Sequence, residues 1–456
     1  MALAYYAQPS SVKILSLSFC VVTVTQSSPK TPDVQALDAM TGGAFAAQTS
    51  GERAAKLRDW LLTEPSQENL QLVYKELSTR DKGAAKVLRE KLDELKRSLG
   101  SAAVALESIV VDAADEAGLR QLCHDTRVVI STVGPYALYG ETLVKVCADT
   151  GTDYCDLTGE VQWIRRMIER YSAAAAASGA RIVHCCGFDS IPSDLGVWFL
   201  QREARKSFGK SCSRVKLRVK AMRGGFSGGT VASLLNVVKE TRANPALRKE
   251  LANPYSLCVG SAVKGVRQPS GATVALDADF RSWIAPFVMS GINTRIVHRS
   301  NFLQSHSYGS DFVYDEAVLT GRGWRGRLAA TATGAGLAAF MVASSIGPVR
   351  TLLERYVLPK PGEGPSPIQQ ERGFFDLRLF GRTSDGRTLR VKVTGDRDPG
   401  YGSTAKMLGE AAVCLAFDVS RAEVAGGFWT PASALGEKLL SRLHAHAGLG
   451  FERQDD

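Results

Sequence analysis

Four short motifs contain the residue types and turns that could do chemistry. The first is STVGPYALYG, residues 131–140, in which a hydrophobic strand ends at Gly134-Pro135 and a helix opens near Gly140. Such a turn brings backbone and small side chains to the carboxyl edge of a parallel sheet, where open α/β sheets bind ligands. An ordinary strand-to-helix turn without a ligand explains the spacing equally well, so both interpretations stay open.

The second motif, GTDYCDLTGE at 151–160, sets three carboxylates beside a short strand. Asp153, Asp156 and Glu160 could polarise a substrate, act as general acid or base, or cap the helix that we expect at 161–176. Capping is the role that we expect of Thr158. No His or Cys stands at metal-ligand spacing, so we expect no metal site.

The third motif, HCCGFDSIPSDLG at 184–196, predicts a strand, a turn at Gly187 and a helix that opens after Asp189. The free N–H groups of that helix could bind an anion, or the motif could be a capped helix and nothing more. We expect Cys185 and Cys186 to be buried in the strand, since no nearby base or cation supports a thiolate.

The fourth motif is GDRDPGYGST at 395–404, a rigid turn after a strand. Its acid–base–acid series, Asp396-Arg397-Asp398, could hold a ligand. A structural ion network that fixes the turn is the alternative, and the residues alone do not separate the two.

Strands that alternate with helices must position the first three motifs, and this alternation predicts a parallel sheet with crossover helices. From about residue 212 the pattern changes to α+β, with alternating strands at VKLRVK and LRVKVTG. The fold class that we expect is therefore α/β, with a parallel-sheet domain first and an α+β domain second. The other elements predicted are helices at 52–62, 66–79, 84–99, 116–124, 140–149, 161–176, 230–242, 403–416 and 432–445, and strands at 108–115, 127–135, 153–157 and 181–188.

Taken together, the motifs resemble one family. STVGPY, GTDYCDLTGE, CGFDSIPSDLG, GGFSGGT, DPGYGSTAKMLGEAA and GGFWTPASALGEKLL, in this order over about residues 84 to 453, resemble the saccharopine dehydrogenase-like oxidoreductases, including the trans-acting enoyl reductases. The resemblance implies a Rossmann-type NAD(P)-binding domain, a second α+β domain, and C-terminal helices that return to the first. It also implies hydride transfer to a lipid-linked or acyl substrate, and an association with lipid metabolism, membranes or lipid droplets.

The resemblance also implies where NADP or NAD would bind. Hydride transfer needs a nicotinamide ring held near the substrate carbon, and the strand ends at 126–133 and 181–186 would face it. Tyr139 or Asp189 could donate or orient a proton, although each could equally be structural. The residues expected around the cofactor are Arg80, Asp112, Ser131, Thr132, Val133, Gly134, Pro135, Tyr136, Gly187 and Phe188.

One family feature is missing. The family opens with a strand and a glycine-rich turn that lets the backbone approach the cofactor pyrophosphate, whereas TGGAFAAQTSG at 41–51 has the wrong spacing and follows no strand pattern. A replaced first exon in the gene model, a loss of cofactor binding, and another route to the pyrophosphate are three open explanations, of which we favour the first. The chain as written is expected to bind a dinucleotide poorly.

The motifs divide the chain into four parts. Residues 1–83 form an atypical N-terminal region, which is either a targeting segment or an altered first β-α-β unit. The others are a Rossmann-type NAD(P)-binding domain at 84–200, an α+β substrate domain at 201–395 with an apolar segment at 328–349, and a C-terminal helical segment at 396–456 that packs on the first domain.

Composition excludes several protein classes. With 456 residues, 45% apolar and 22% charged, the chain is neither collagen-like, nor disordered, nor a polytopic membrane protein. Nine scattered cysteines favour reduced thiols in an intracellular compartment. Residues 1–32 hold no acid and include the apolar run 14–24, which is either a strand or a mitochondrial or plastid targeting segment.

Two local features bear on partners. Residues 201–260 hold thirteen Lys and Arg against three Glu, a formal +10 that equals the excess of the whole chain, and predict a cationic face. Residues 328–349 carry no charge, which predicts a buried helix, an interfacial helix or a membrane span. A non-catalytic protein of membranes or lipid droplets, derived from the same family, is therefore the rival to the enzyme. Nucleic acid is not an expected partner, because aromatic residues do not interleave the basic ones, and a homodimer is an open alternative.

Overall fold

The computed structural model describes residues 19–22, 96–97, 111, 113–224, 228–260, 265–269, 274–347, 349–350, 353 and 364–454. The helices expected at 52–62 and 66–79, nearly all of the helix at 84–99, and the expected cofactor residues Arg80 and Asp112 lie outside these ranges. By its contacts the chain separates into residues 22–122 and a unit of residues 2–21 and 123–456. The second unit holds the four motifs and is described below.

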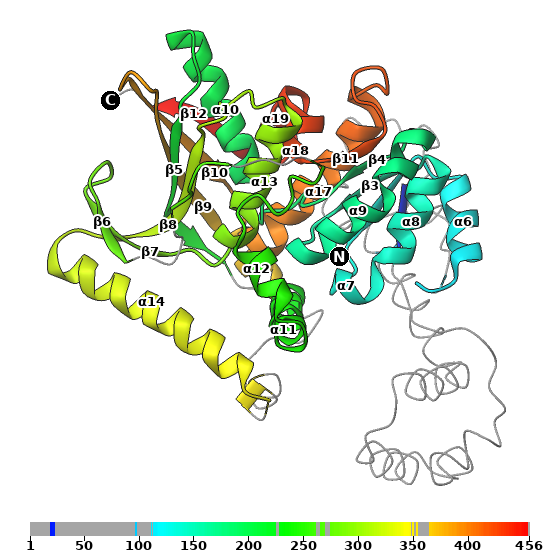
Figure 1. The fold of residues 1–456 in the computed structure, drawn as a ribbon, viewed down its shortest axis with the longest axis horizontal. Helices are drawn as coiled ribbons and strands as arrows, with labels where there is room; N and C mark the ends of the chain where they lie inside the picture. The colour runs from blue at the N-terminus through cyan, green and yellow to red at the C-terminus, as the bar shows by residue number, and fades with distance from the viewer. Residues whose placement is uncertain are drawn as a thin grey trace. The chain divides into compact units, whose positions relative to one another are not determined.

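The first sheet has five strands in the order β1-β2-β3-β4-β11 (Figure 1). The pairs β2–β3, β3–β4 and β4–β11 are parallel. Runs such as Val128-Val129-Ile130 are buried along their whole length, as expected of parallel strands covered on both faces by helices. The strands are β1 (Phe19–Val22), β2 (Val128–Ser131), β3 (Asp153–Asp156), β4 (Arg181–Val183) and β11 (Gly427–Trp429).

The helices predicted between these strands are present. The helix predicted at 140–149 is α8, and that at 161–176 is α9, which ends at Gly179 in the left-handed conformation that favours glycine. The helices along this part of the chain are α6 (Glu116–His124), α7 (Tyr136–Tyr139), α8 (Glu141–Thr150), α9 (Val161–Ser178) and α10 (Ile191–Phe208).

The second sheet is mixed and has seven strands in the order β12-β10-β9-β5-β8-β7-β6. Its central strand β5 pairs antiparallel with β9 and parallel with β8. The two sheets and their helices confirm the expected α/β class with a second α+β part. The strands are β5 (Arg214–Arg223), β6 (Ala275–Asp277), β7 (Ser282–Pro286), β8 (Val313–Gly321), β9 (Phe374–Arg382), β10 (Thr388–Gly395) and β12 (Leu449–Gln454).

The remaining helices cover this sheet or connect it to the first. The 403–416 prediction corresponds to α17 with π-helical turns on both sides, and the 432–445 prediction to α18 and α19. The helices are α11 (Gly228–Ala243), α12 (Ala246–Ala252), α13 (Ser290–Leu303), α14 (Gly323–Ser345), α16 (Pro367–Glu371), η2 (Pro399–Ser403), α17 (Thr404–Val413), η3 (Cys414–Asp418), α18 (Pro431–Ala434) and α19 (Gly436–His446).

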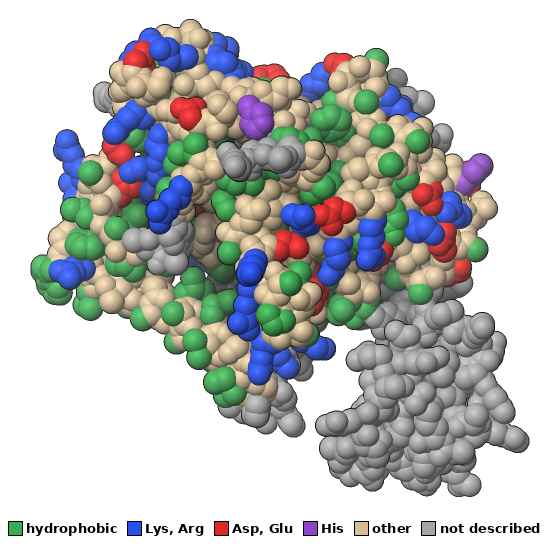
Figure 2. Space-filling model, in the orientation of Figure 1, with side chains coloured by type: hydrophobic (Ala, Val, Ile, Leu, Met, Phe, Trp, Pro, Cys, Tyr) green, Lys and Arg blue, Asp and Glu red, His purple; other side chains and the backbone are tan. Residues whose placement is uncertain are grey.

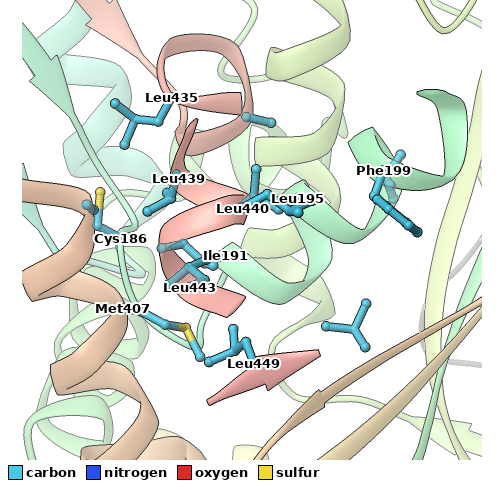
Figure 3. Close-up of a cluster of buried hydrophobic side chains, with 14 of the residues drawn as sticks. Cys186, Ile191, Leu195, Phe199, Met407, Leu435, Leu439, Leu440, Leu443 and Leu449 are labelled. Atoms are coloured by element: carbon cyan, nitrogen blue, oxygen red, sulfur yellow. The ribbon is translucent and has the colours of Figure 1, made fainter. Parts of the chain in front are cut away.

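One apolar cluster joins both sheets. It combines side chains from the first sheet, such as Cys155, with side chains from the second, such as Leu217 and Val391. Helices α10 and α19 meet inside it, with Leu195 of α10 beside Leu440 of α19 (Figure 3). Because burial of apolar side chains is the main favourable contribution to folding, the two sheets share one core.

The expected cationic face is wrong as a property of residues 201–260 as a whole. On β5, Lys216 and Arg218 form ion pairs with Asp277, and Arg218 also contacts Asp315. Other basic residues of this segment pair with carboxylates on distant elements, including Lys210 with Asp385. Sequence reasoning could not foresee these partners, because they arrive from strands far along the chain.

As expected, the C-terminal segment packs against the first sheet. A buried arginine of the sheet makes this contact. Arg181 at the start of β4 bonds both carboxylate oxygens of Asp153, with Nη2 at 2.5 Å from Oδ2. The same guanidinium donates to the carbonyls of Leu415 and Val419 at 2.7 and 2.6 Å. Both side chains are almost fully buried, so the pair ties η3 to β3 and β4. This pairing shows that Asp153 is structural rather than catalytic.

We predict that Arg181→Met lowers the free energy of unfolding by about 3–5 kcal/mol, because it leaves the Asp153 carboxylate buried without its partner. Urea unfolding followed by circular dichroism measures the effect. The matched control is Arg382→Met, since Arg382 is 49% exposed and pairs with Asp279, away from Asp153. We expect the control to cost about 1 kcal/mol or less. Equal losses in the two variants would contradict the role given to Arg181.

Candidate functional site

The loops that follow β2, β3 and β4 meet at the carboxyl edge of the first sheet. Tyr136, which follows the Gly134-Pro135 turn, is buried and donates from its hydroxyl to the carbonyl of Ser131 at 2.9 Å. The backbone N–H of Leu157 points at the same hydroxyl at 3.4 Å. Burial, as the main cause, raises the pKa of Tyr136 well above its usual value, so this phenol stays protonated and holds the loops together.

Glu160 joins this edge to a helix of the second sheet. Its carboxylate accepts from the backbone N–H groups of Tyr136 and Ala137 at 2.7 and 3.0 Å, and from the hydroxyl of Ser233 on α11 at 2.8 Å. Burial raises the pKa of Glu160, while these three donors act in the opposite direction. The carboxylate therefore positions α7 and α11 against each other.

The capping of α9 expected of Thr158 is wrong, and capping is excluded among the roles left open for Glu160. No side chain caps α9 at Glu160, because its carboxylate is committed to α7. Thr158 instead accepts from the backbone N–H of Glu160 at 3.2 Å, within the turn itself.

Asp156 and His184 form a buried pair behind the edge. Nδ1 of His184 lies 2.7 Å from Oδ2 of Asp156, whose other oxygen accepts from the backbone of Cys185 at 3.0 Å. Nε2 of His184 is buried and, among the described residues, makes no hydrogen bond. The His184 ring packs edge-on against Trp163, so the pair is enclosed and fixes the strand ends.

The cysteines of the third motif are buried, as expected. Cys185 adopts a left-handed backbone, with φ of 63°, and its thiol donates to the carbonyl of Thr158 at 2.9 Å. Burial raises the pKa of both Cys185 and Cys186 well above the usual value. Both are therefore neutral thiols and poor nucleophiles.

Asp189 is the carboxyl group at this edge that stays uncommitted. Its side chain is half-buried and forms no hydrogen bond with another described residue. Burial raises its pKa from 3.8 to about 7, so near neutral pH it can hold or release a proton. Asp194 has a similarly raised pKa of about 7, but it bonds Ser300 and the backbone of Ala432 and is structural.

Two expected cofactor residues lie toward the second sheet. A methyl group on Gly187 would come within 3.1 Å of the Thr404 side chain, so this glycine allows close packing against α17. The backbone N–H of Phe188 donates to Thr404 Oγ1 at 3.0 Å, and its ring contacts that of Phe375. Both residues thus have a packing role in the structure, whatever contact they make with a cofactor.

The other expected residues form an open edge after β2. Ser131 is buried, whereas Thr132 is exposed and Val133, Gly134 and Pro135 are half-buried. A methyl group on Gly134 would meet no atom closer than 3.5 Å, so its exposed side is uncrowded. These residues fit the approach of a flat nicotinamide ring. Tyr139 lies on α7, half-buried, and the described residues give it no hydrogen-bond partner.

Ser233 is the site residue that sequence reasoning missed. It follows the GGFSGGT motif at the start of α11, and a small-residue motif opening a helix was the one available signal. Its partner Glu160 lies 73 residues earlier in the chain, a separation that no local pattern encodes.

The fourth motif fixes a turn. The Asp398 carboxylate accepts from the backbone N–H groups of Gly400, Tyr401 and Gly402 at 3.0, 3.1 and 2.8 Å. Arg397 pairs with Glu371. The structural interpretation of the motif is therefore confirmed for Asp398, whose acceptor positions are filled. The described residues contain no cluster of His, Cys, Asp or Glu that could hold a metal ion.

A surface groove of about 430 Å³ runs beside the edge. It starts at Ala137, next to the Glu160 contact, and its charged walls are ion-paired, Arg166 with Glu240 and Arg170 with Glu141. Because these charges are neutralised by each other, the groove favours a ligand with little net charge. The full lining is Ala137, Glu141, Arg166, Arg170, Glu240, Ala243, Asn244 and Leu247.

Comparisons with known proteins identify the family of this chain. Residues 71–183 match the family model "Saccharopine dehydrogenase NADP binding domain", which confirms an NAD(P)-type cofactor for this chain. A trans-acting enoyl reductase of Mycobacterium tuberculosis (strain ATCC 25618 / H37Rv) is 37% identical over 372 residues, covering 78% of this chain and 87% of the relative. The trans-acting enoyl reductase of Mycobacterium ulcerans (strain Agy99) is 36% identical over 395 residues, covering 82% and 92%.

Among solved structures, apo saccharopine dehydrogenase (L-Glu forming) of Saccharomyces cerevisiae matches with a TM-score of 0.43 and 12% identity, covering 79% of this chain and 91% of that one. The family assignment rests on the sequence relatives, because their similarity to this chain extends over more than three quarters of its length. The chain belongs to the saccharopine dehydrogenase-like oxidoreductases, the family that includes the trans-acting enoyl reductases.

Proposed function

We propose that this chain reduces a carbon–carbon double bond in a lipid-linked acyl substrate, with NADPH as the hydride donor. The observation that carries the proposal is the uncommitted Asp189 carboxyl, with a pKa of about 7, at the edge where the cofactor residues gather. A reductase of this kind needs one hydride and one proton for each double bond. The relatives named as trans-acting enoyl reductases support the choice of reaction.

The residues divide the work as follows. When bound, the dinucleotide supplies the hydride, which goes to one carbon of the double bond. The half-buried backbone at Val133 and Gly134 supports the ring. The Asp189 carboxylic acid gives its proton to the other carbon and is re-protonated from solvent. Glu160 positions the loop by holding Tyr136 and Ala137, and its carboxylate takes no part in proton transfer because three donors already bind it.

A non-catalytic role at a lipid surface is the second candidate function. One helix of the described residues, α14, favours it, because it is apolar and largely exposed. The two candidates differ in one property: the reductase requires a bound dinucleotide, and a purely structural protein does not.

The choice of NADPH rather than NADH is part of the proposal. It rests on the matched family model, which is described as an NADP-binding domain. Arg80, one of the residues expected around the cofactor, lies outside the described residues, so its contact with the 2′-phosphate is part of the proposal.

We predict that Gly134→Val weakens NADPH binding about tenfold or more, because the added side chain occupies the space left open for the ring. Fluorescence titration measures the dissociation constant, and thermal unfolding shows that the fold is retained. Gly291→Val is the matched control, since a methyl group there meets no atom within 4 Å. Equal affinities in both variants would contradict the placement of the cofactor.

The wild-type titration tests the missing glycine-rich turn separately. If the argument from that turn is correct, the dissociation constant for NADPH is weaker than about micromolar, since the pyrophosphate lacks its usual backbone contacts. A micromolar or tighter constant would overturn that argument and leave the reductase proposal intact.

We predict that Asp189→Asn lowers kcat by about 10²-fold with little change in KM, because the amide cannot supply a proton. In the wild type, kcat falls as the pH rises through about 7, where the carboxyl loses its proton, and this decline is absent in the variant. Asp194→Asn is the control: Asp194 has the same raised pKa but lies in a structural network. A wild-type pH profile that survives in Asp189→Asn would exclude Asp189 as the donor.

A further inference from the structure

Helix α14 has an apolar outer surface where a helix of a water-soluble protein would carry charge. Small residues make its close contacts with the protein: Gly326 lies against the Gly321 backbone, and Ala330 is fully buried. Large apolar side chains point outward, with Trp324 71%, Leu328 63% and Val342 62% exposed. The most apolar stretch of α14 has a mean hydropathy of 1.4 and is 11% buried.

Of the three alternatives for 328–349, the buried helix is therefore excluded. An amphipathic surface helix turns its apolar stripe inward and its polar face outward. In α14 the exposed side carries Trp324, Leu328 and Val342 among alanines and threonines, and no charged residue occurs from Leu328 to Val349. Figure 1 shows α14 with one end near β6 and β7 and the other near α11. An exposed apolar surface of this size favours contact with a lipid or with another protein rather than with water.

The sheet topology excludes a single membrane crossing by α14. Strand β8 leads into α14 and strand β9 follows it, yet both pair with the same strand β5. A helix that crossed a bilayer once would place β8 and β9 on opposite sides. A return crossing needs about 20 apolar residues, whereas residues 346–366 include Arg350, Glu354, Arg355, Lys360 and Glu363. The helix can therefore lie along a membrane surface but not span it.

Basic residues without acidic partners in the described ranges lie at the start of α14, on α11, which contacts α14, and on α12, which contacts α11. Arg322, Arg325 and Arg327 lie at its start, and residues 322–353 contain no Asp or Glu. On the neighbouring α11 and α12, four more are exposed: Lys239, Arg242, Arg248 and Lys249. Throughout the ranges that the structure describes, no carboxylate forms an ion pair with any of these seven. Figure 2 shows hydrophobic side chains along α14 and Lys and Arg side chains gathered over α11 and α12.

The two features belong to one surface. Arg242 of α11 donates to the carbonyl of Ser345 at the end of α14, so the basic helix and the apolar helix are held together. Lysines and arginines near a membrane are attracted to anionic headgroups, and a tryptophan beside them favours the boundary between headgroups and acyl chains. An anionic phospholipid leaflet offers both acidic headgroups for the basic residues and acyl chains for the apolar helix. A second protein chain would have to present acidic and apolar groups in the matching arrangement.

We propose that α14 lies flat in the headgroup–acyl boundary of an anionic phospholipid leaflet, with the basic residues of α11 and α12 on the headgroups. The docking does not depend on the proposed reductase activity. Docking would nevertheless affect the reductase site, because helix α11 connects the two. It carries Ser233 at the site edge and Arg242 at the lipid surface. A substrate with an acyl chain would then reach the site from the leaflet.

The test is co-flotation of the full-length protein with vesicles of phosphatidylcholine alone or mixed with phosphatidylserine. We expect the wild type to float with the mixed vesicles and to dissociate as salt is raised, because salt screens the attraction to headgroups. The double variant Leu328→Asp/Val342→Asp is expected to bind at least tenfold more weakly. Arg248→Gln is expected to lose about fivefold, corresponding to one surface charge.

The control variant is Ile368→Asp, which replaces an aliphatic side chain of equal exposure, 61%, on α16. It should float like the wild type, and all variants should unfold at the wild-type temperature. Failure of the wild type to bind mixed vesicles overturns the proposal, and so does an equal loss in Ile368→Asp. A wild-type dimer that Leu328→Asp/Val342→Asp dissociates, without vesicle binding, would show instead that α14 binds a second copy.

Discussion

The Glu160 carboxylate bonds groups from three parts of the molecule. Its oxygens accept from the first two N–H groups of α7 and from the Ser233 hydroxyl of α11. A buried carboxylate with fewer donors would be costly, because an unpaired buried charge loses its hydration without replacement. The turn after β2, the loop after β3 and the first part of α11 must therefore occupy their observed positions together. The open edge at Thr132–Pro135 and the neighbouring groove depend on this arrangement.

The same constraint gives the two carboxyl groups at the edge different roles. Glu160 is saturated by donors and serves as a fixed support. Asp189, with no bond to the other residues that the structure describes, is kept partly protonated near neutral pH by burial. Environment rather than residue type thus separates a support from a candidate proton donor, and the sequence motifs alone present both as equivalent acids. Helix α11 extends this organisation away from the site, since its far end binds α14 through Arg242.

Much of the fold could be predicted from local patterns. The apolar run at 127–133 predicted β2, alternation predicted β5 and β10, and the succession of strands and helices predicted β3, α8 and α9. Long-range pairings could not be predicted in this way. Strand β11 joins β4 across more than two hundred residues, and Arg218 is neutralised by Asp277 and Asp315 from other strands. The cationic face expected of residues 201–260 was wrong for this reason, and only its part on α11 and α12 remains.

The proposed function depends most directly on hydride transfer from a dinucleotide to a double bond. The decisive measurement is mass spectrometry of the product formed from a 2-enoyl thioester with NADPH that carries deuterium at the transferable position. We expect a saturated product with one deuterium on one carbon of the former double bond and a solvent proton on the other. Recovery of unchanged enoyl thioester, while the protein binds the labelled NADPH, would contradict it.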